Sequence, residues 1–333
     1  MDMPRISLLM PVHNAADTLV EAVDSIRGQH LDAWEFIMVD DGSTDASPTI
    51  MRQYARQDPR IRCIFRERCG IVEALATAAE SARGPLLARM DADDVAAPAR
   101  LRTQAALFER FPDLALCGAR IRICGHALGS GRKRYESWIN SLTQHEDIVR
   151  DIFVECPIPH PTFMMPRDVF QAVGGYRDQG WPEDYDLVLR LWQQGAQFAK
   201  PEPTLLHWRN RPTRLSMTDQ RYGEKAFRAL KRHFLLATML QGTDGRFYQW
   251  GAGEVGKKWL REWTQPPEAV VDINPRKIGR AIHGVPVISP EQLPPPGQAV
   301  VLIAVGAPGA REEIRAYLHP KHYKEPDHFR FIA

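Results

Sequence analysis

Two acidic turns are the parts of this sequence best suited to chemistry. The first contains Asp41 and follows an apolar run that ends at Val39; the second contains Asp91, Asp93 and Asp94. Hard divalent cations are commonly held by one or two carboxylates while they also touch phosphate oxygens, so the two turns together predict a site for a chelated diphosphate. An aspartate-rich loop on its own is more often a solvated turn or a helix cap, and the rest of the chain must decide between the two readings.

The elements that would position these turns follow a regular rhythm. Short apolar runs alternate with helical patterns over residues 6–12, 18–29, 35–39, 47–57 and 61–65. This alternation is typical of βαβ units and predicts an α/β fold with a mainly parallel sheet. In such sheets ligands bind beyond the carboxyl ends of the strands. We therefore expect residues 11–14, 40–42 and 91–94 to converge on one crevice.

Composition sets the remaining bounds. A chain of 333 residues with 44% hydrophobic residues is long enough for two domains, and a net charge of +2 gives no general attraction for nucleic acid. The five cysteines lack zinc-site spacing and predict reduced thiols. We find no leader pattern and no run of roughly 20 apolar residues, which predicts a cytoplasmic enzyme without a transmembrane segment. Peripheral contact with the inner face of the cell membrane is left open.

Five motifs carry a family resemblance. In order and spacing they resemble the inverting glycosyltransferases of family 2, which have the GT-A fold, over about residues 4–217; the motifs are Pro11–Asn14, Val39–Asp45, Arg89–Asp94, Gly174–Tyr176 and Glu183–Leu187. The resemblance implies a GT-A domain that transfers a sugar from a nucleotide-diphosphate donor to a hydroxyl acceptor. It also implies a saccharide or lipid-linked saccharide as acceptor, in the synthesis of bacterial surface polysaccharide or glycoconjugates.

The resemblance assigns the second acidic turn to a divalent cation, Mn²⁺ or Mg²⁺. It implies that Asp93 is the direct ligand, that Asp91 reaches the donor ribose or the metal, and that Asp94 supports the loop. A cation there would act as a Lewis acid on the departing diphosphate.

The rest of the donor site also follows from the resemblance. Asp41 would accept a hydrogen bond from the base ring, while Pro11 and His13 would line the nucleoside pocket. The basic stretch that begins at His207 is expected to be a loop near the phosphates, with Arg209 as the phosphate contact, because arginine forks suit a diphosphate. Arg209 and the arginines after it could equally be surface residues.

An inverting transfer needs a base on the acceptor side. Asp184 is the residue that the resemblance puts forward, with Glu183 as an orienting neighbour and Asp186 as a helix-start residue or acceptor contact. The apolar spacing after Asp186 predicts a helix that begins near Glu183, so the alternative is that these acids only complement the helix dipole. His160 would border the acceptor or mark the start of a strand.

A change of character near residue 218 predicts a second domain. We place the glycosyltransferase domain at 1–218, a helical linker at 219–244 and a Rossmann-like accessory domain at 245–333. Gly251, Gly253 and Gly256 follow a predicted strand, and Asp272 lies 21 positions beyond Gly251, as in dinucleotide-binding fingerprints. This part resembles the small amino-terminal domain of PglD-type sugar acyltransferases.

Two function classes compete with glycosyl transfer at this stage. The first is an oxidoreductase that binds NAD at the glycine loop; in an accessory module the same loop could hold a nucleotide or serve only strand-to-helix packing. The second is a noncatalytic carbohydrate-binding or scaffold protein with the same fold, and the presence of Asp91, Asp93 and Asp184 argues against it. The basic run Arg132–Arg134 is expected to be a solvated loop or a contact for anionic lipid or polysaccharide.

Overall fold

A computed structural model describes residues 3–125, 129–211, 214–241 and 246–333, and these residues form two compact units. The first unit comprises the chain up to Ile148 together with Pro157–Tyr222, and the second comprises Val149–Cys156 together with Gly223–Ala333. The stretch predicted as a helical linker, 219–244, contains α10 (Glu224–Ala237), and the contacts of this helix group it with the second unit. Residues 242–244 of that stretch lie outside the described residues.

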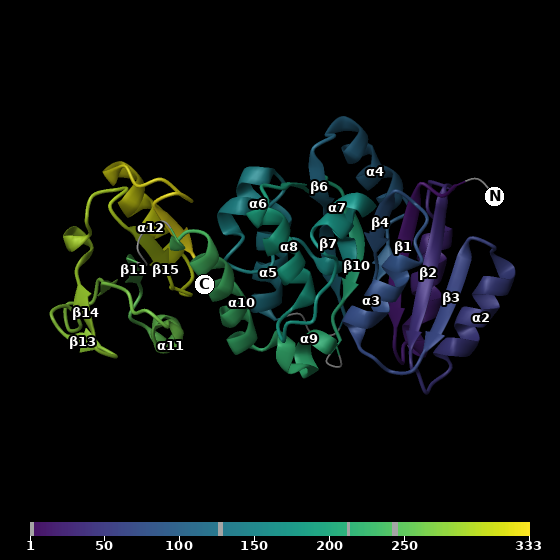
Figure 1. The fold of residues 1–333 in the computed structure, drawn as a ribbon, viewed down its shortest axis with the longest axis horizontal. Coiled ribbons are helices and arrows are strands. Elements are labelled where there is room, and N and C mark those ends of the chain that lie inside the picture. The colour runs from purple at the N-terminus through teal and green to yellow at the C-terminus, as the bar shows by residue number, and fades with distance from the viewer. Residues whose placement is uncertain (1–2, 126–128, 212–213, 242–245) are drawn as a thin grey trace. The chain divides into compact units, whose positions relative to one another are not determined.

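The first unit is built on a seven-stranded sheet of order β3-β2-β1-β4-β8-β6-β9. Its first four strands are parallel; they are β1 (Ile6–Val12), β2 (Trp34–Asp41), β3 (Ile61–Arg66) and β4 (Leu86–Arg89). β1 and β2 are buried over almost their whole length, as expected of parallel strands covered on both faces. The colours of Figure 1 show β1, β2 and β3 side by side in the N-terminal part of the chain. The α/β fold class is confirmed.

The other half of the sheet is mixed. β8 (Met164–Pro166) runs antiparallel to both β4 and β6 (Leu114–Cys117), and β9 (Gln197–Ala199) runs parallel to β6. A second, three-stranded sheet has the order β5-β10-β7, with β5 (Val95–Ala96), β7 (Arg120–Cys124) and β10 (Thr204–Arg209). β5 directly follows the second acidic turn, so the turn is fixed between strands of two sheets.

Helices cover the sheet and lead into the site. α3 (Ile71–Glu80) packs on β1 and β2, and α2 (Ser47–Gln57) packs on β2 and β3. The other helices of this unit are α1 (Ala16–Arg27), α4 (Arg100–Arg110), α5 (Ser130–Ser141), α7 (Arg167–Ala172), α8 (Glu183–Gln193) and α9 (Leu215–Thr218), while α6 (His145–Asp151) extends across the boundary of the two units. Among the described residues, no helix combines the length and the apolar character that crossing a membrane requires.

The second unit contains a smaller, mainly parallel sheet of order β13-β14-β12-β11-β15-β16. Its strands are β11 (Phe247–Trp250), β12 (Ala269–Val271), β13 (Ala281–Ile282), β14 (Val285–Ile288), β15 (Val300–Ile303) and β16 (Phe329–Phe331), and β13 alone is antiparallel to its neighbour among those described. The helices α11 (Glu254–Glu262) and α12 (Ala310–Leu318) follow β11 and β15. The chain order reverses between β11 and β15, which gives the Rossmann-like arrangement that the sequence predicted.

Candidate active site

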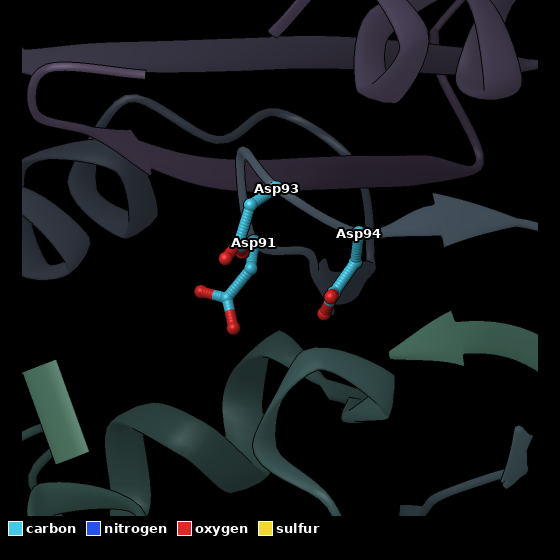
Figure 2. A group of neighbouring side chains, drawn as sticks. All are labelled: Asp91, Asp93 and Asp94. Atoms are coloured by element: carbon cyan, nitrogen blue, oxygen red, sulfur yellow. The ribbon is translucent and has the colours of Figure 1, made fainter. Parts of the chain in front are cut away.

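The second acidic turn follows β4, and its three carboxylates gather at one point. Asp91, Asp93 and Asp94 each offer a carboxylate oxygen, and these oxygens all lie within 4.8 Å of one another. Figure 2 shows the three side chains projecting from the same short loop to the same side. Asp94 is fully buried, whereas Asp91 and Asp93 are partly exposed. Geometry and burial both allow an ion to reach Asp91 and Asp93.

The electrostatics of the turn suit a cation. Burial, followed by repulsion from Asp91, raises the pKa of Asp93 and raises that of Asp94 well above its usual range. Asp94 Oδ1 accepts a hydrogen bond from the backbone N–H of Arg209 at 2.9 Å, but its buried Oδ2 has no hydrogen-bond partner among the described residues. A hard divalent ion with oxygen ligands would offset the repulsion between these carboxylates, so the residues fit such an ion.

Two arginines neutralise part of this charge. The buried Arg89 pairs with Asp91 through an Nη2–Oδ1 distance of 2.6 Å, and its Nε and Nη1 atoms have no hydrogen-bond partner among the described residues. Arg214 Nη2 lies 3.7 Å from Asp91 Oδ2, and its guanidinium lies 4.4 Å from the centre of the Trp208 ring. Asp91 therefore contacts cations on two sides, while Asp93 has no ion pair of 4 Å or less among the described residues.

A cavity of about 510 Å³ opens beside this turn. It is lined by the carboxyl ends of β1 and β2 and by the loops that follow β1, β3 and β4; the lining includes Pro11, His13, Asp41, Asp91 and Asp93. The three loops that the sequence predicted to converge do converge. Five of the residues assigned to donor or cation binding thus lie around one space.

The Asp41 side of the cavity is held by backbone contacts. Asp41 Oδ1 accepts hydrogen bonds from the N–H groups of Cys69 at 2.6 Å and Gly70 at 3.1 Å, and Gly70 N–H also lies 3.1 Å from Oδ2. His13 Nδ1 lies 2.8 Å from the Asp41 carbonyl oxygen, and His13 Nε2 contacts the Arg68 guanidinium. The carboxylate is therefore fixed in place while lone pairs on Oδ2 stay open for a further donor.

The arginines around the cavity are only partly those expected from the basic stretch that begins at His207. Arg68, Arg211, Arg214 and Arg221 line it, whereas Arg209 is not among the lining residues. Arg209 is the last residue of β10 instead of part of a loop, and its Nε donates to the Asp93 carbonyl oxygen at 2.9 Å while Nη2 pairs with Glu21. Arg209 thus supports the acidic turn through its hydrogen bond to the Asp93 backbone and does not line the cavity, because its place at the end of β10 fixes the direction of its side chain.

Arg68 and Arg221 are the lining cations that the motifs did not identify. Arg68 belongs to the connection between β3 and α3, and Arg221 follows α9 in a short 3₁₀ turn where it forms a two-pronged pair with Asp219, at 2.7 Å for Nη2–Oδ2. Neither residue stands next to a recognisable motif. The sequence signal available for them is their position near the end of a predicted strand or short helix.

The residues assigned to the acceptor side form a second cluster at the start of α8. Asp184 Oδ1 accepts a hydrogen bond from the N–H of Tyr185 at 2.7 Å, and its side chain is 19% exposed. Asp186 is buried and bonded to Trp181 Nε1 at 3.1 Å and Arg190 Nε at 2.7 Å. Asp186 therefore has its contacts inside the unit, as a helix-start residue, and Asp184 is the exposed member.

A buried network supports Asp184. His160 Nε2 lies 2.9 Å from the Tyr176 hydroxyl, while His160 Nδ1 lies 3.6 Å from Glu183 Oε1 and 4.0 Å from Asp184 Oδ2. The Tyr222 hydroxyl donates to Glu183 Oε2 at 2.7 Å. Burial, with a smaller effect of the Arg89 charge, holds the pKa of His160 well below its usual range, so the ring is neutral. Its Nε2 then accepts from tyrosine and its Nδ1–H faces the two carboxylates.

Burial also raises the pKa of Glu183, in spite of its bond to Tyr222. Glu183 is 1% exposed, so it is enclosed where Asp184 is open. Arg89 connects this cluster with the acidic turn, because its charge acts on Tyr176 and Glu183 as well as on Asp91. Asp184 itself is not among the described residues that line the cavity. Arg89 therefore links Asp91, which lines the cavity, with Glu183, the chain neighbour of Asp184.

Comparison with known proteins identifies the first unit. The sequence profile of Glycosyl transferase family 2 matches residues 7–174, half of the chain. The chain belongs to this family. The match includes both acidic turns and the residues around the Asp41 side of the cavity, and it ends before α8.

Curated relatives agree with the family. EpsE of Bacillus subtilis is 29% identical over 197 residues, which cover 58% of this chain and 68% of that protein. The amylovoran biosynthesis glycosyltransferase AmsE of Erwinia amylovora is 27% identical over 204 residues, which cover 60% of this chain and 74% of that protein. The chain spans 26% of the length of another relative, the uncharacterized protein y4gI of Sinorhizobium fredii, over a stretch that is 29% identical.

Solved structures share the fold. S. aureus TarS in complex with UDP-GlcNAc superposes with a TM-score of 0.57 at 15% identity, covering 71% of this chain and 66% of that chain. The mannosyltransferase PcManGT from Pyrobaculum calidifontis, in complex with GDP-Man and Mn²⁺, has a TM-score of 0.50 at 19% identity, covering 72% of this chain and 64% of that chain. Identities this low establish the fold alone, and the fold is that of GT-A glycosyltransferases.

Proposed function

We propose that this chain transfers a sugar from a nucleotide-diphosphate donor to a hydroxyl acceptor, with inversion at the anomeric carbon and with the assistance of a divalent cation. The observation that carries the proposal is the cavity in which Asp41, Asp91 and Asp93 meet several arginines. Carboxylates alone would repel a diphosphate, and arginines alone would not select a cation-bound one. Their combination in one space suits a diphosphate that arrives with its cation.

Within this proposal, different residues of the cavity bind different parts of the donor. Asp93 and Asp91 hold Mn²⁺ or Mg²⁺, with Asp94 as the buried support, and Arg211 and Arg214 face the phosphates. Asp41 accepts from the base through its open Oδ2, beside Pro11 and His13, which wall the nucleoside. The bound cation supplies Lewis-acid stabilisation of the leaving diphosphate. GDP-Man with Mn²⁺ in PcManGT and UDP-GlcNAc in TarS support a donor of this class.

Asp184 is the proposed base. As the acceptor oxygen attacks the anomeric carbon, its proton passes to the Asp184 carboxylate while the bond from that carbon to the diphosphate oxygen breaks. The transfer is a single displacement, so no covalent sugar–enzyme intermediate forms. Asp184 suits this role because its carboxylate is partly exposed, whereas Glu183 is enclosed and orients the cluster. Its neighbour His160 is neutral and therefore does not pair with the carboxylate as a cation.

The biological setting is inferred from relatives. AmsE is named for amylovoran biosynthesis and TuaG of Bacillus subtilis for teichuronic acid biosynthesis. These names support surface-polysaccharide assembly, with a saccharide or lipid-linked saccharide as the acceptor and a site of action in the cytoplasm or at the inner face of the cell membrane. The proposal includes residues 245–333 as an accessory domain of the kind found at the amino terminus of PglD-type acyltransferases.

The test is a panel of nucleotide sugars that includes UDP-GlcNAc and GDP-Man, read through release of the nucleoside diphosphate. We expect release with Mn²⁺ or Mg²⁺ and its loss on chelation. Asp93→Ala should abolish cation-dependent donor binding in calorimetry. Asp32→Ala is the matched control, because the Asp32 side chain is 99% exposed and is not among the described residues that line the cavity. Release that persists unchanged in EDTA or in Asp93→Ala would refute the cation site.

A further inference from the structure

The second unit contains a cavity of its own, of about 640 Å³. It is formed where the strand order reverses, by the segments that follow β11 and β15 and by those that follow β12 and β14. Open α/β sheets bind ligands at this reversal, beyond the carboxyl ends of the strands. The proposed glycosyl transfer uses none of the residues around it, so the cavity requires a separate explanation.

The walls of this cavity suit a flat ring. Trp250 and Tyr317 both line it, with their ring centres 5.6 Å apart in an edge-on arrangement, and Val305 and Ile314 add aliphatic surface. Ile273 also lines the cavity and is 72% exposed, although it follows the buried strand β12. Ile273 thus extends the apolar surface beside the aromatic walls, and a mainly apolar lining is typical of ligand pockets.

One end of the cavity offers backbone donors. Gly253 is the N-cap of α11, with no side-chain capping bond, and a Cβ atom built on it would meet nothing within 4 Å. By contrast, a Cβ atom on Gly256 would lie 1.9 Å from the Gly251 carbonyl oxygen. Gly256 is therefore needed for packing of the helix against the strand, while Gly253 keeps the start of α11 accessible. Open amides at a helix start bind phosphate.

Asp272 stands between the apolar walls and the glycine loop. It follows β12 and lines the cavity, and its Oδ2 accepts from the N–H of Ala252 at 3.0 Å and from Lys277 Nζ at 3.0 Å. Its Oδ1 accepts from the N–H of Asn274 at 2.8 Å. These bonds fix the carboxylate, which has about four lone-pair sites, and leave one acceptor position on Oδ1. A fixed acceptor at this place suits a ribose hydroxyl.

We propose that the second unit binds a mononucleotide at this cavity, without a divalent cation. The base lies against Trp250 and Ile273, one ribose hydroxyl donates to Asp272 Oδ1, and the phosphate lies at the start of α11. A dinucleotide such as NAD is disfavoured, because the part of the lining contributed after β15 includes Glu313 and Tyr317 and offers no cation for a second phosphate–ribose half among the described residues. The site goes beyond the proposed transfer reaction and does not depend on it.

The test is hydrogen exchange of the full chain in EDTA, with UDP, GDP, ADP and NAD as separate probes. We expect at least one mononucleotide to protect the amides of residues 250–256, whatever happens to the loop at 91–94. Because the two segments are read separately, a failure of the glycosyltransferase site does not affect the reading of the second unit. Absence of protection at 250–256 with every probe, or stronger protection by NAD than by each mononucleotide, overturns the proposal.

Gly253→Glu is the diagnostic variant, since the glycine has an ordinary φ of −82° and open space around it. A carboxylate at this point should weaken nucleotide binding at 250–256 by about tenfold or more through repulsion of the phosphate. Gly131→Glu is the matched control, because Gly131 likewise has nothing within 4 Å and lies in α5 of the other unit. An unchanged melting temperature in both variants excludes unfolding, and equal binding by both would contradict the site.

Discussion

Asp184→Asn is the substitution that tests the proposed chemistry most directly. Asp184 Oδ1 accepts the Tyr185 N–H at 2.7 Å, and an asparagine keeps this acceptor while it loses the capacity to take up a proton. His160 Nδ1 lies 4.0 Å from Asp184 Oδ2, beyond hydrogen-bond distance, so the substitution breaks no hydrogen bond to His160. The variant should therefore fold and bind donor as the parent protein does, and yet transfer sugar poorly.

The substitution should change the free energy of unfolding and the activation free energy by very different amounts. Removing one negative charge from the first turn of α8 should lower the free energy of unfolding by about 0.3–1 kcal/mol. Removing a general base typically slows a reaction by about 10²–10⁴-fold, which corresponds to an increase of about 3–5 kcal/mol in the activation free energy. The loss of activity should thus exceed the loss of stability severalfold.

The assay compares kcat for acceptor-dependent release of the nucleoside diphosphate, donor affinity by calorimetry and the urea midpoint. Asp168→Asn is the matched control, because Asp168 also lies in the first turn of a helix, α7, and accepts the N–H of the next residue, Val169, at 2.9 Å. It should show the small stability change without the kinetic one. Turnover within threefold of the parent in Asp184→Asn would show that another group takes the acceptor proton.

Two further predictions concern buried cations. Arg100→Met should lower the free energy of unfolding by about 0–3 kcal/mol. The substitution removes hydrogen bonds from the guanidinium to the Arg89 carbonyl at 2.6 Å and to Gln104 Oε1 at 3.0 Å, which together contribute about 3–6 kcal/mol. It also removes a buried charge, since burial lowers the pKa of Arg100 to about 10 and so disfavours the charged form by about 3 kcal/mol. A urea titration measures the difference, and a net stabilisation would contradict the argument. Burial lowers the pKa of Lys231 from 10.5 to about 8, so above pH 8 the unfolded chain retains a proton that the folded chain has released, and stability should rise across this window by up to about 3 kcal/mol. Urea midpoints at the two ends of the window should show this slope in the parent and not in Lys231→Met, and equal slopes would refute it.

Much of the first unit could be predicted because its elements are local and strongly patterned. The predicted ranges 6–12 and 47–57 coincide with β1 and α2, since each is an apolar or amphipathic run with clear ends. The antiparallel half of the sheet could not be predicted. β8 has three residues, and Met164 pairs with both Ala88 and Cys117, so the strand owes its place to distant partners rather than to its own pattern.

The site divides in the same way. The acidic turns could be located because residue type and position after a strand are both visible in the sequence. Side-chain reach was not visible, which is why Arg209 turns to the Asp93 carbonyl while Arg68 and Arg221 line the cavity. The support of His160 by Tyr176 joins residues 16 positions apart without helical or strand spacing, so no periodicity could indicate it. The domain boundaries and the individual residue roles stay predictions.

The short segment Val149–Cys156 decides how this chain can be divided. It leaves the first unit and belongs to the second, where Lys231 Nζ donates to the Val154 carbonyl at 2.7 Å and Arg330 Nη1 to the Val149 carbonyl at 3.0 Å. The backbone thus passes between the units three times, at 148–149, 156–157 and 222–223. A chain truncated after Tyr222 would retain Val149–Cys156 but would lack Lys231 and Arg330, which donate hydrogen bonds to this segment. Separate expression of either unit therefore requires that the segment from 149 to 156, which includes the end of α6, be redesigned.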